Sequence, residues 1–296
     1  MLVEKLAPEY TLEEAFGYCR NLATGHYENF TVVSCLTPAA LRPFMHSLYA
    51  FCRYTDDLGD EAEGDRLKLL DDWENDLLTG YSGGSPVHPI MIALQDTVRN
   101  FDIPIDPFLR LIKANRMDQG NKRYLTYSDL LHYCDHSANP VGHMVLYLFG
   151  YRDEERQLLS DSVCTGLQLA NFWQDVWRDW EMGRIYIPME DMQQFDYSED
   201  DLRDRRYNSN FKNLMEFQVE RARQLFAEGR HLAGKVDGRL KLDIKLFNLG
   251  GIAVLNAIED GDYNVLYKRP TISKTQKIFL ALRGLIPGNV PVRGVS

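Results

Sequence analysis

Apolar residues recur at intervals of three or four positions along most of the chain, and no run alternates strictly between apolar and polar residues. A spacing of three or four residues is that of an amphipathic α-helix, whereas strict alternation is typical of a half-buried strand. The pattern therefore predicts an all-α fold. Helices are expected at about 11–26, 37–61, 64–79, 87–101, 106–122, 126–149, 154–181, 208–235, 240–262 and 272–285.

Local signals support several of these boundaries. Thr11 followed by Glu14 forms a capping box, and Thr37 with the proline after it marks another helix start. Glycine and proline interrupt the helical period most clearly at 80–86 and 183–188. Neither interruption has the length of a domain linker, and no repeat of fixed period is present. We therefore expect residues 1–296 to form a single all-helical domain. The resemblance described below adds the expectation of a central cavity.

The helix predicted at 37–61 ends in the acidic sequence Asp-Asp-Leu-Gly-Asp. Asp56 and Asp60 are four residues apart and share one helix face, with Arg53 and Tyr49 one and two turns earlier on that face. Two carboxylates at this spacing can hold a divalent cation between them. Acids near a helix C-terminus oppose the macrodipole, so the placement is unfavourable without a cation. A solvated helix end is the alternative.

The helix predicted at 154–181 carries a second polar stripe on an otherwise apolar surface. Four polar residues fall within an arc of about 80° on it: Gln168, Asn171, Asp175 and Asp179. A helix this apolar should be buried, and its carboxylates then need a cation or a change of protonation state. Internal salt bridges to arginines such as Arg53 or Arg178 are the alternative.

The two stripes together point to a metal. If both face one cavity, at least four carboxylates converge there, and they repel each other unless divalent cations lie between them. Oxygen ligands suit Mg²⁺, which typically bridges a few carboxylates to substrate phosphates. The natural substrate of such a site is a diphosphate.

Composition and charge indicate which partners and which cellular compartment to expect. The net charge of −10 argues against a nucleic-acid partner. The five cysteines lie in apolar segments without a C-x-x-C pair, which indicates reduced thiols. Neither a signal-peptide pattern nor an apolar run of spanning length is present, so a cytoplasmic protein is expected. The basic amphipathic segment 268–283 could make peripheral contact with the inner membrane face, and a docked terminal helix is the alternative.

Three segments carry a resemblance to a known family: Tyr49-Ala-Phe-Cys-Arg-x-x-Asp-Asp-x-x-Asp60, Gln168-Leu-x-Asn-x-x-x-Asp-x-x-x-Asp179 and Arg184-Ile-Tyr-Ile-Pro188. The chain resembles, along nearly its whole length, the squalene/phytoene synthase family of head-to-head prenyl synthases. The resemblance implies the all-helical isoprenoid synthase fold and an isoprenoid diphosphate substrate, either presqualene or farnesyl diphosphate. It also implies companion enzymes of the squalene pathway as partners.

The resemblance assigns roles to individual residues. The Mg²⁺ ligands it implies are Asp56, Asp60, Asn171, Asp175 and Asp179. The diphosphate contacts it implies are Arg53 and Gln168, and Tyr49 would line the reaction site. Arg184 and Tyr186 lie in a loop that closes over the leaving group in the family, with an ordinary turn as the alternative.

A polar segment near the N-terminus contacts phosphate in this family. Here it reads His26-Tyr-Glu-Asn-Phe-Thr31, with Asn29 where a serine is usual, so His26, Asn29 and Phe30 are expected to bind substrate. The hydrocarbon chain of the substrate needs an apolar tunnel. The candidates for its walls are Phe30, Phe51, Leu146, Phe172 and Trp173. The alternative is that these side chains are simply part of the core.

The largest departure from the family pattern is the segment 133–142, in which His136 replaces a tyrosine, Ser137 a valine and Asn139 a glycine. This variant resembles the bacterial hydroxysqualene synthase branch. The resemblance implies that presqualene diphosphate is ionised and its carbocation captured by water. In an apolar cavity water is held only by polar side chains, and His136, Ser137 and Asn139 offer the donors and acceptors for this, so His136 and Asn139 are expected to be catalytic. No strand with a G-x-G-x-x-G turn is seen, so NADPH is not expected. A capping or solvent-facing histidine is the alternative for His136.

Other functions stay open. A squalene, dehydrosqualene or phytoene synthase would share both acidic motifs. A head-to-tail prenyl transferase or a terpene cyclase also carries Asp-Asp-x-x-Asp, but the segment after Asn171 lacks the Ser, Thr and Glu that cyclases add. A catalytically silent helical partner that only binds an isoprenoid is the rival from another class.

Overall fold

The computed structural model describes residues 10–25, 37–120, 122–273 and 282–283. Every regular element in these ranges is helical, and the all-α prediction is confirmed. The chain forms two compact units, unit 1 (Met1–Gln119 and His143–Arg152) and unit 2 (Gly120–Gly142 and Asp153–Ser296). Because the chain leaves unit 1 and later returns to it, neither unit is one continuous stretch of sequence. The single domain with a central cavity stays a prediction.

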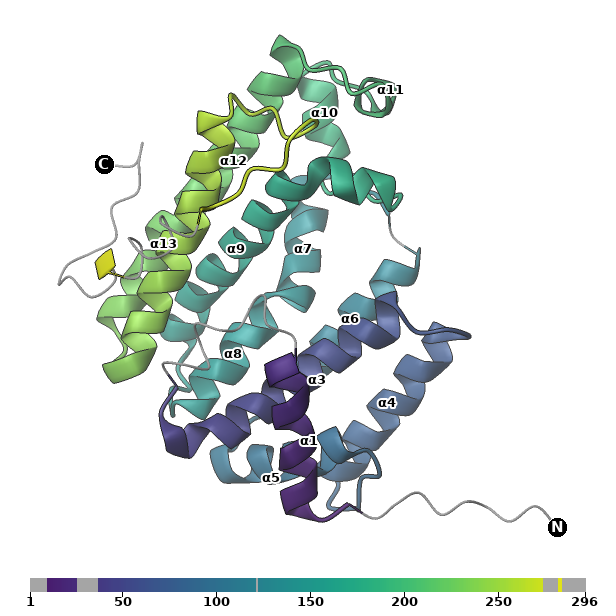
Figure 1. Cartoon of the computed structure of the whole chain (residues 1–296), viewed down its shortest axis with the longest axis vertical. Coiled ribbons are helices and arrows are strands. Elements are labelled where there is room, and N and C mark those ends of the chain that lie inside the picture. The colour runs from purple at the N-terminus through teal and green to yellow at the C-terminus, as the bar shows by residue number, and fades with distance from the viewer. Residues whose placement is uncertain (1–9, 26–36, 121, 274–281, 284–296) are drawn as a thin grey trace. The chain divides into compact units, whose positions relative to one another are not determined.

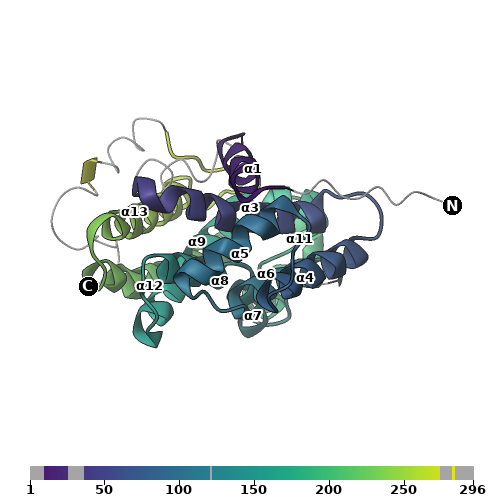
Figure 2. The same cartoon turned by 90° about the horizontal axis from the view of Figure 1, so that it is seen from below.

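Unit 1 is built mainly from helices of the first 120 residues. Its elements are α1 (Leu12–Gly25), the 3₁₀ turn η1 (Ala39–Leu41), α3 (Arg42–Asp60), α4 (Arg66–Tyr81), α5 (Pro89–Phe101) and α6 (Asp106–Gly120). Helix α1 packs against both α3 and α5, as Figures 1 and 2 show. The predicted capping box holds the start of α1, where Thr11 N donates to Glu14 Oε2 at 2.8 Å. Phe51 of α3 centres the core, with its ring 5.0 Å from that of Phe108 and 5.6 Å from that of Trp73.

Unit 2 is organised around the long helix α9. Its elements are α7 (Tyr127–Ser137), α9 (Glu154–Glu181), α10 (Met189–Gln194), α11 (Glu199–Arg203), α12 (Ser209–Gly229), the 3₁₀ turn η2 (Arg230–Gly234) and α13 (Gly238–Asp260). Helices α12 and α13 both pack on α9 (Figure 1). Phe226 of α12 fills the space that Gly251 of α13 leaves, because a Cβ on Gly251 would lie 2.1 Å from the Phe226 ring. Helix α8 (Asn139–Leu148) begins in unit 2 and ends in unit 1.

Several predicted boundaries need correction. The single helix expected at 126–149 is divided into α7 and α8 at Ala138. Pro140 explains the break, because it has no N–H for the carbonyl four residues earlier and its ring collides with that carbonyl. The short helices α10 and α11 were not predicted, since five or six residues are too few to show a period. The helix expected at 272–285 lies mostly outside the described residues.

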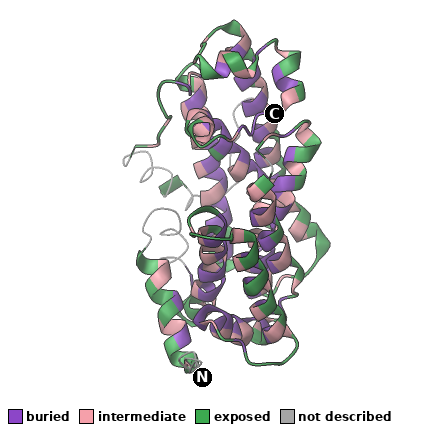
Figure 3. Cartoon of the chain, turned by 90° about the vertical axis from the view of Figure 1, so that its right-hand side faces the viewer, coloured by how far each residue is buried: buried purple, intermediate pink, exposed green. Residues whose placement is uncertain are grey.

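Burial follows the predicted faces. Along the helices, buried and exposed positions lie on opposite sides (Figure 3). On α9, whose bounds match the prediction, Leu169, Phe172, Trp173 and Val176 are buried. None of the described helices combines the length and the apolar character needed to cross a bilayer. The four described cysteines, Cys19, Cys52, Cys134 and Cys164, are free, and Cys35 lies outside the described residues.

Asp243 of α13 should make the stability of the protein depend on pH. Its side chain is buried, and its Oδ1 has no hydrogen-bond partner in the described part of the chain. Burial raises the pKa of Asp243 to about 7, whereas an unfolded chain has a pKa of about 3.9. Between these values the native state keeps a proton that the unfolded chain has lost, so stability falls as pH rises from about 4 to about 7.

Asp243→Asn removes this charge and is expected to raise the free energy of unfolding at about pH 8 by on the order of 1–3 kcal/mol. At about pH 4 the variant and the parent should be nearly equal, because the carboxyl is then neutral in the native protein. Urea unfolding at both pH values measures the difference. The same gain at both would contradict the explanation.

Candidate active site

The first acidic motif occupies the accessible side of α3. Asp56 and Asp60 are exposed and Tyr49 and Arg53 partly so, while the opposite side of the helix is buried. We call these four residues the α3 acid face. Arg53 pairs with two other acids, since its Nη2 lies 2.5 Å from Asp57 Oδ1 and 3.0 Å from the carboxylate of Glu61, the residue after α3. The charge of Asp57 is thereby neutralised.

Asp56 has one partner from another helix. Asn115 Nδ2 of α6 donates to Asp56 Oδ1 at 3.2 Å. The side chain of Asp56 keeps open surface, yet the protein around it reduces its hydration and raises its pKa to about 6, with Asp60 adding to the rise and Asn115 opposing it. A carboxylate held in this way gains from a nearby cation. Asn115 was missed by sequence reasoning, although an amide on the buried side of α6 was a usable signal.

The second motif forms the accessible side of α9. Asn171 is exposed and Gln168, Asp175 and Asp179 are partly exposed, whereas the apolar residues Leu169, Ala170, Phe172, Trp173 and Val176 between them are buried. We call these four residues the α9 acid face. The predicted combination of a buried apolar helix and one polar stripe is confirmed.

Internal salt bridges, the alternative interpretation, occur at one of the two acids of this face. Asp175 Oδ1 lies 3.4 Å from Arg178 Nη1 and 2.6 Å from Arg269 Nε, and its Oδ2 accepts from Arg269 Nη2 at 2.8 Å. The pKa of Asp179 rises to about 7, first through loss of hydration and then through repulsion from Asp175. The charges of Arg184, Arg178 and Arg269 only partly offset this rise. A nearby cation would therefore stabilise the charged form of Asp179.

Arg269 was not predicted to belong to the site. It follows α13 in the chain, and besides its fork on Asp175 it donates through Nη2 to Gln174 Oε1 at 3.0 Å. Gln174 Nε2 in turn donates to the carbonyl of Pro270 at 2.5 Å. The basic character of segment 268–283 was the available signal, which left both peripheral membrane contact and a docked terminal helix open. The described start of that segment contacts α9 through Arg269.

The loop after α9 is fixed by an aromatic stack. The Tyr186 ring lies 3.7 Å from that of Phe172 at an interplanar angle of 7°, and 5.7 Å from that of Tyr124 at an interplanar angle of 20°. The backbone N–H of Ile185 donates to the carbonyl of Lys122 at 3.1 Å, within the isolated bridge that joins Arg123 to Ile185. The backbone of Arg184 is therefore held in place, and its N–H donates to the carbonyl of Asp179 at 2.8 Å.

The polar residues at the junction of α7 and α8 are buried or half-buried. His136 is 7% exposed, so the solvent-facing alternative is wrong, and its Nδ1 lies 2.8 Å from the carbonyl of His132. Asn139 Oδ1 accepts from Thr165 Oγ1 of α9 at 2.9 Å, with both residues buried. Ser137 Oγ is buried without a hydrogen-bond partner in the described part of the chain. We call His136, Ser137 and Asn139 the polar wall; Thr165 was not predicted.

Some predicted residues cannot be placed. His26, Asn29 and Phe30 lie outside the described residues. The other tunnel candidates, Phe51, Leu146, Phe172 and Trp173, are buried, and their role as tunnel walls stays a prediction. The α3 acid face belongs to unit 1 and the α9 acid face to unit 2. Within the ranges that the structure describes, neither unit alone brings together three or more His, Cys, Asp or Glu side chains that could hold a metal ion.

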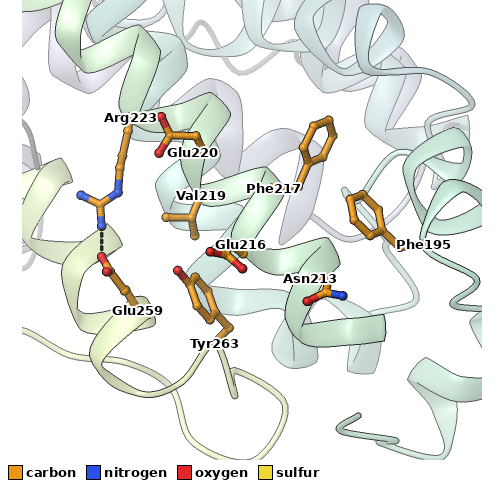
Figure 4. A pocket seen from close by; sticks show the side chains of 9 residues that line it. All are labelled: Phe195, Asn213, Glu216, Phe217, Val219, Glu220, Arg223, Glu259 and Tyr263. Atoms are coloured by element: carbon orange, nitrogen blue, oxygen red, sulfur yellow. Dashed lines mark hydrogen bonds and ion pairs between the residues drawn. The ribbon is translucent and has the colours of Figure 1, made fainter. Parts of the chain in front are cut away.

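Unit 2 also contains an open pocket away from these residues. Its volume is about 490 Å³, and Glu216, Glu220 and Tyr263 line it beside the ion pair of Arg223 with Glu259 (Figure 4). No residue of the acid faces or the polar wall lines this pocket. The candidate active site is therefore defined by the two acid faces, the polar wall and the contacts of their residues, and not by this pocket.

Comparison with known proteins decides the family. The model of the squalene/phytoene synthase family matches residues 23–276. The chain belongs to the squalene/phytoene synthase family. Members of this family are enzymes that process prenyl diphosphates, and the resemblance drawn from the three motifs is confirmed.

Individual relatives show which members are similar. The crystal structure of squalene synthase HpnC from Alicyclobacillus acidocaldarius is 48% identical, has a TM-score of 0.83 and aligns over 86% of this chain and 96% of that one. A dehydrosqualene synthase in complex with ligand is 26% identical, with a TM-score of 0.84 over 92% of this chain and 96% of that one. The 15-cis-phytoene synthase of Synechocystis is 33% identical over 287 residues, which is 92% of this chain and 84% of the relative.

Proposed function

We propose that this enzyme ionises presqualene diphosphate with the help of Mg²⁺ and captures the carbocation with water, giving hydroxysqualene and diphosphate. The observation that carries the proposal is the polar wall, a buried histidine and asparagine and a half-buried serine with a buried hydroxyl, in a family whose substrates are largely hydrocarbon. The Ser137 hydroxyl has no protein partner in the described part of the chain, as expected of a group that binds water. The 48% identity to squalene synthase HpnC supports a place in squalene or hopanoid synthesis.

The residues of the two acid faces fit Mg²⁺. All the donors are oxygen atoms, and two of the acids, Asp56 and Asp179, have pKa values raised to about 6 and about 7. Each face supplies two carboxylates. The residues that would hold the metal are Asp56 and Asp60 of the α3 acid face and Asn171, Asp175 and Asp179 of the α9 acid face. When bound, the metal supplies stabilisation of the negative charge that develops on the departing diphosphate.

The protein's own residues would then act around the reacting bond. Arg53, Gln168 and Arg269 would bind the diphosphate oxygens, and the fixed loop would bring Arg184 to the same group. The carbon–oxygen bond breaks with its electron pair on the leaving group. Tyr49 would line the space that the resulting cation occupies.

Water capture would take place at the polar wall. A carbonyl only accepts, so Nδ1 of His136, 2.8 Å from the carbonyl of His132, would carry the hydrogen, and in the neutral ring Nε2 would be the nitrogen that accepts a proton. A water oxygen forms the new bond to carbon, and its proton passes to Nε2. Asn139, held by Thr165 at 2.9 Å, would keep that water in place.

Two alternative functions stand beside the proposed one. Squalene, dehydrosqualene or phytoene synthesis from two prenyl diphosphates is the nearer one, and the 33% identity to a 15-cis-phytoene synthase favours it. A silent isoprenoid-binding partner is the more distant one, and both complete acid faces speak against it. A cytoplasmic enzyme in contact with companion enzymes and the inner membrane face would suit a hydrocarbon product.

Product identification tests the proposal. Purified enzyme incubated with presqualene diphosphate and Mg²⁺, without NADPH, is expected to release diphosphate and form hydroxysqualene, identified by mass spectrometry. In H₂¹⁸O the hydroxyl oxygen should carry the label. Squalene, dehydrosqualene or phytoene as the main product would overturn the water-capture step, and the absence of any turnover would favour the silent partner.

A variant of the polar wall provides the matched comparison. His136→Tyr with Asn139→Gly restores the residues usual in the family, and we expect the share of hydroxylated product to fall by at least about tenfold. Diphosphate release should change much less, because the acid faces are intact. An unchanged product would show that the polar wall does not place the water.

A further inference from the structure

We propose that Asn115 is a positioning residue that fixes the Asp56 carboxylate for the metal, and that Gly59 is required within the acidic motif because Asn115 needs the space. The inference rests on the proposed function, in which Asp56 is a metal ligand. It concerns a residue on α6, outside both family motifs, and it explains a glycine inside one of them.

The hydrogen bonds of Asn115 determine how its amide is oriented. The side chain is 5% exposed, and its Nδ2 donates to Asp56 Oδ1 and to the carbonyl of Leu111, both at 3.2 Å. Both partners only accept, so the nitrogen must face them. One oxygen of Asp56 is thus held from a second helix, and the rotation of the carboxylate is restricted while its other oxygen is left for a cation.

Gly59 allows this contact. A Cβ built on Gly59 would lie 2.2 Å from Asn115 Oδ1, far inside van der Waals contact. The backbone around Gly59 is also held, because its carbonyl accepts from Gln119 Nε2 at 2.9 Å and from Arg66 Nη1 at 3.2 Å. With the end of α3 fixed in this way, any side chain at position 59 has to displace Asn115.

Partners of this kind set metal affinity. A ligand carboxylate that can turn freely loses entropy on binding, whereas one already oriented by a hydrogen bond loses less, and removing such a partner typically lowers metal affinity by about 10- to 100-fold. The Arg53–Asp57 pair beside it does not replace this function, since it holds a different carboxylate.

Direct binding of Mn²⁺ in the presence of inorganic pyrophosphate, followed by electron paramagnetic resonance, tests the inference without turnover. Asn115→Ala, and Asn115→Leu, which fills a similar volume, are both expected to weaken Mn²⁺ binding by at least about tenfold. Asn100→Ala is the matched control, because its Nδ2 also donates to an aspartate, Asp96 Oδ2, at 3.0 Å but on the exposed surface of α5. It should bind Mn²⁺ like the parent.

A double-mutant cycle separates positioning from general damage. Gly59→Ala alone is expected to weaken Mn²⁺ binding, because the new methyl group pushes Asn115 away from Asp56. In the Asn115→Ala background the amide oxygen at 2.2 Å is gone and only the Cβ of residue 115 stays, 3.2 Å from the new methyl group, so the same substitution should add much less. Fully additive losses, or parent-like binding by both Asn115 variants, would overturn the inference.

The outcomes also separate this inference from the proposed function. If the parent protein binds no Mn²⁺ with pyrophosphate, the proposed metal site itself is wrong. If the parent binds it and the Asn115 variants bind it equally well, only the positioning role is wrong. Raising Mg²⁺ should restore turnover of Asn115→Ala toward the parent kcat, as expected when affinity rather than chemistry is impaired.

Discussion

Asp179→Asn is expected to slow diphosphate release from presqualene diphosphate by on the order of a hundred- to a thousandfold. The amide keeps the shape of the side chain and one oxygen but loses the negative charge that would hold Mg²⁺ beside the leaving group. The pKa of Asp179 is raised to about 7 by lost hydration and by Asp175, so its charge is unfavourable in the metal-free protein. Steady-state release of diphosphate at saturating Mg²⁺ measures the effect.

Stability shows whether the Asp179→Asn loss is chemical. Removing an unfavourable charge should leave the variant at least as stable as the parent at about pH 8, because the folded pKa lies above the unfolded one. Glu154→Gln, an exposed change in the first turn of the same helix, should retain the parent's rate. A near-parent rate for Asp179→Asn would remove α9 from the metal site.

Arg269→Ala should lower the rate of diphosphate release by on the order of a hundredfold while leaving Mn²⁺ binding equal or tighter. In the structure the Arg269 guanidinium forms a fork on Asp175, with contacts of 2.6 and 2.8 Å, and so competes with a cation for that carboxylate. In the reaction it would turn to the diphosphate oxygens. Its removal therefore frees a metal ligand but takes a positive charge from the leaving group.

The opposite directions of these two effects make the test specific. Lys268→Ala removes the neighbouring exposed cation and serves as the control, with neither quantity expected to change beyond about twofold. Weaker Mn²⁺ binding by Arg269→Ala would mean that the arginine supports Asp175 rather than competing for it. An unchanged rate would exclude Arg269 from the diphosphate site.

The sequence alone determined the helices and the two acid faces, because both depend on spacing along one helix. Residues four apart lie on one side of any α-helix whatever surrounds it, so Asp56 with Asp60 and Asp175 with Asp179 could be paired without tertiary information. The bounds of α9 followed from the same periodicity. The break at Pro140 was also readable in the chain, and it was missed because the apolar period continues on both sides of it.

Only the tertiary structure decided which side chains from other elements meet these faces. Asn115 reaches Asp56 across 59 residues of chain and Arg269 reaches Asp175 across 94, and no local rule predicts contacts at such separations. The burial of His136 likewise depends on how the helices pack. Helical spacing places charges on a surface, but the partner of each charge is chosen by packing between distant segments, which sequence periodicity does not encode.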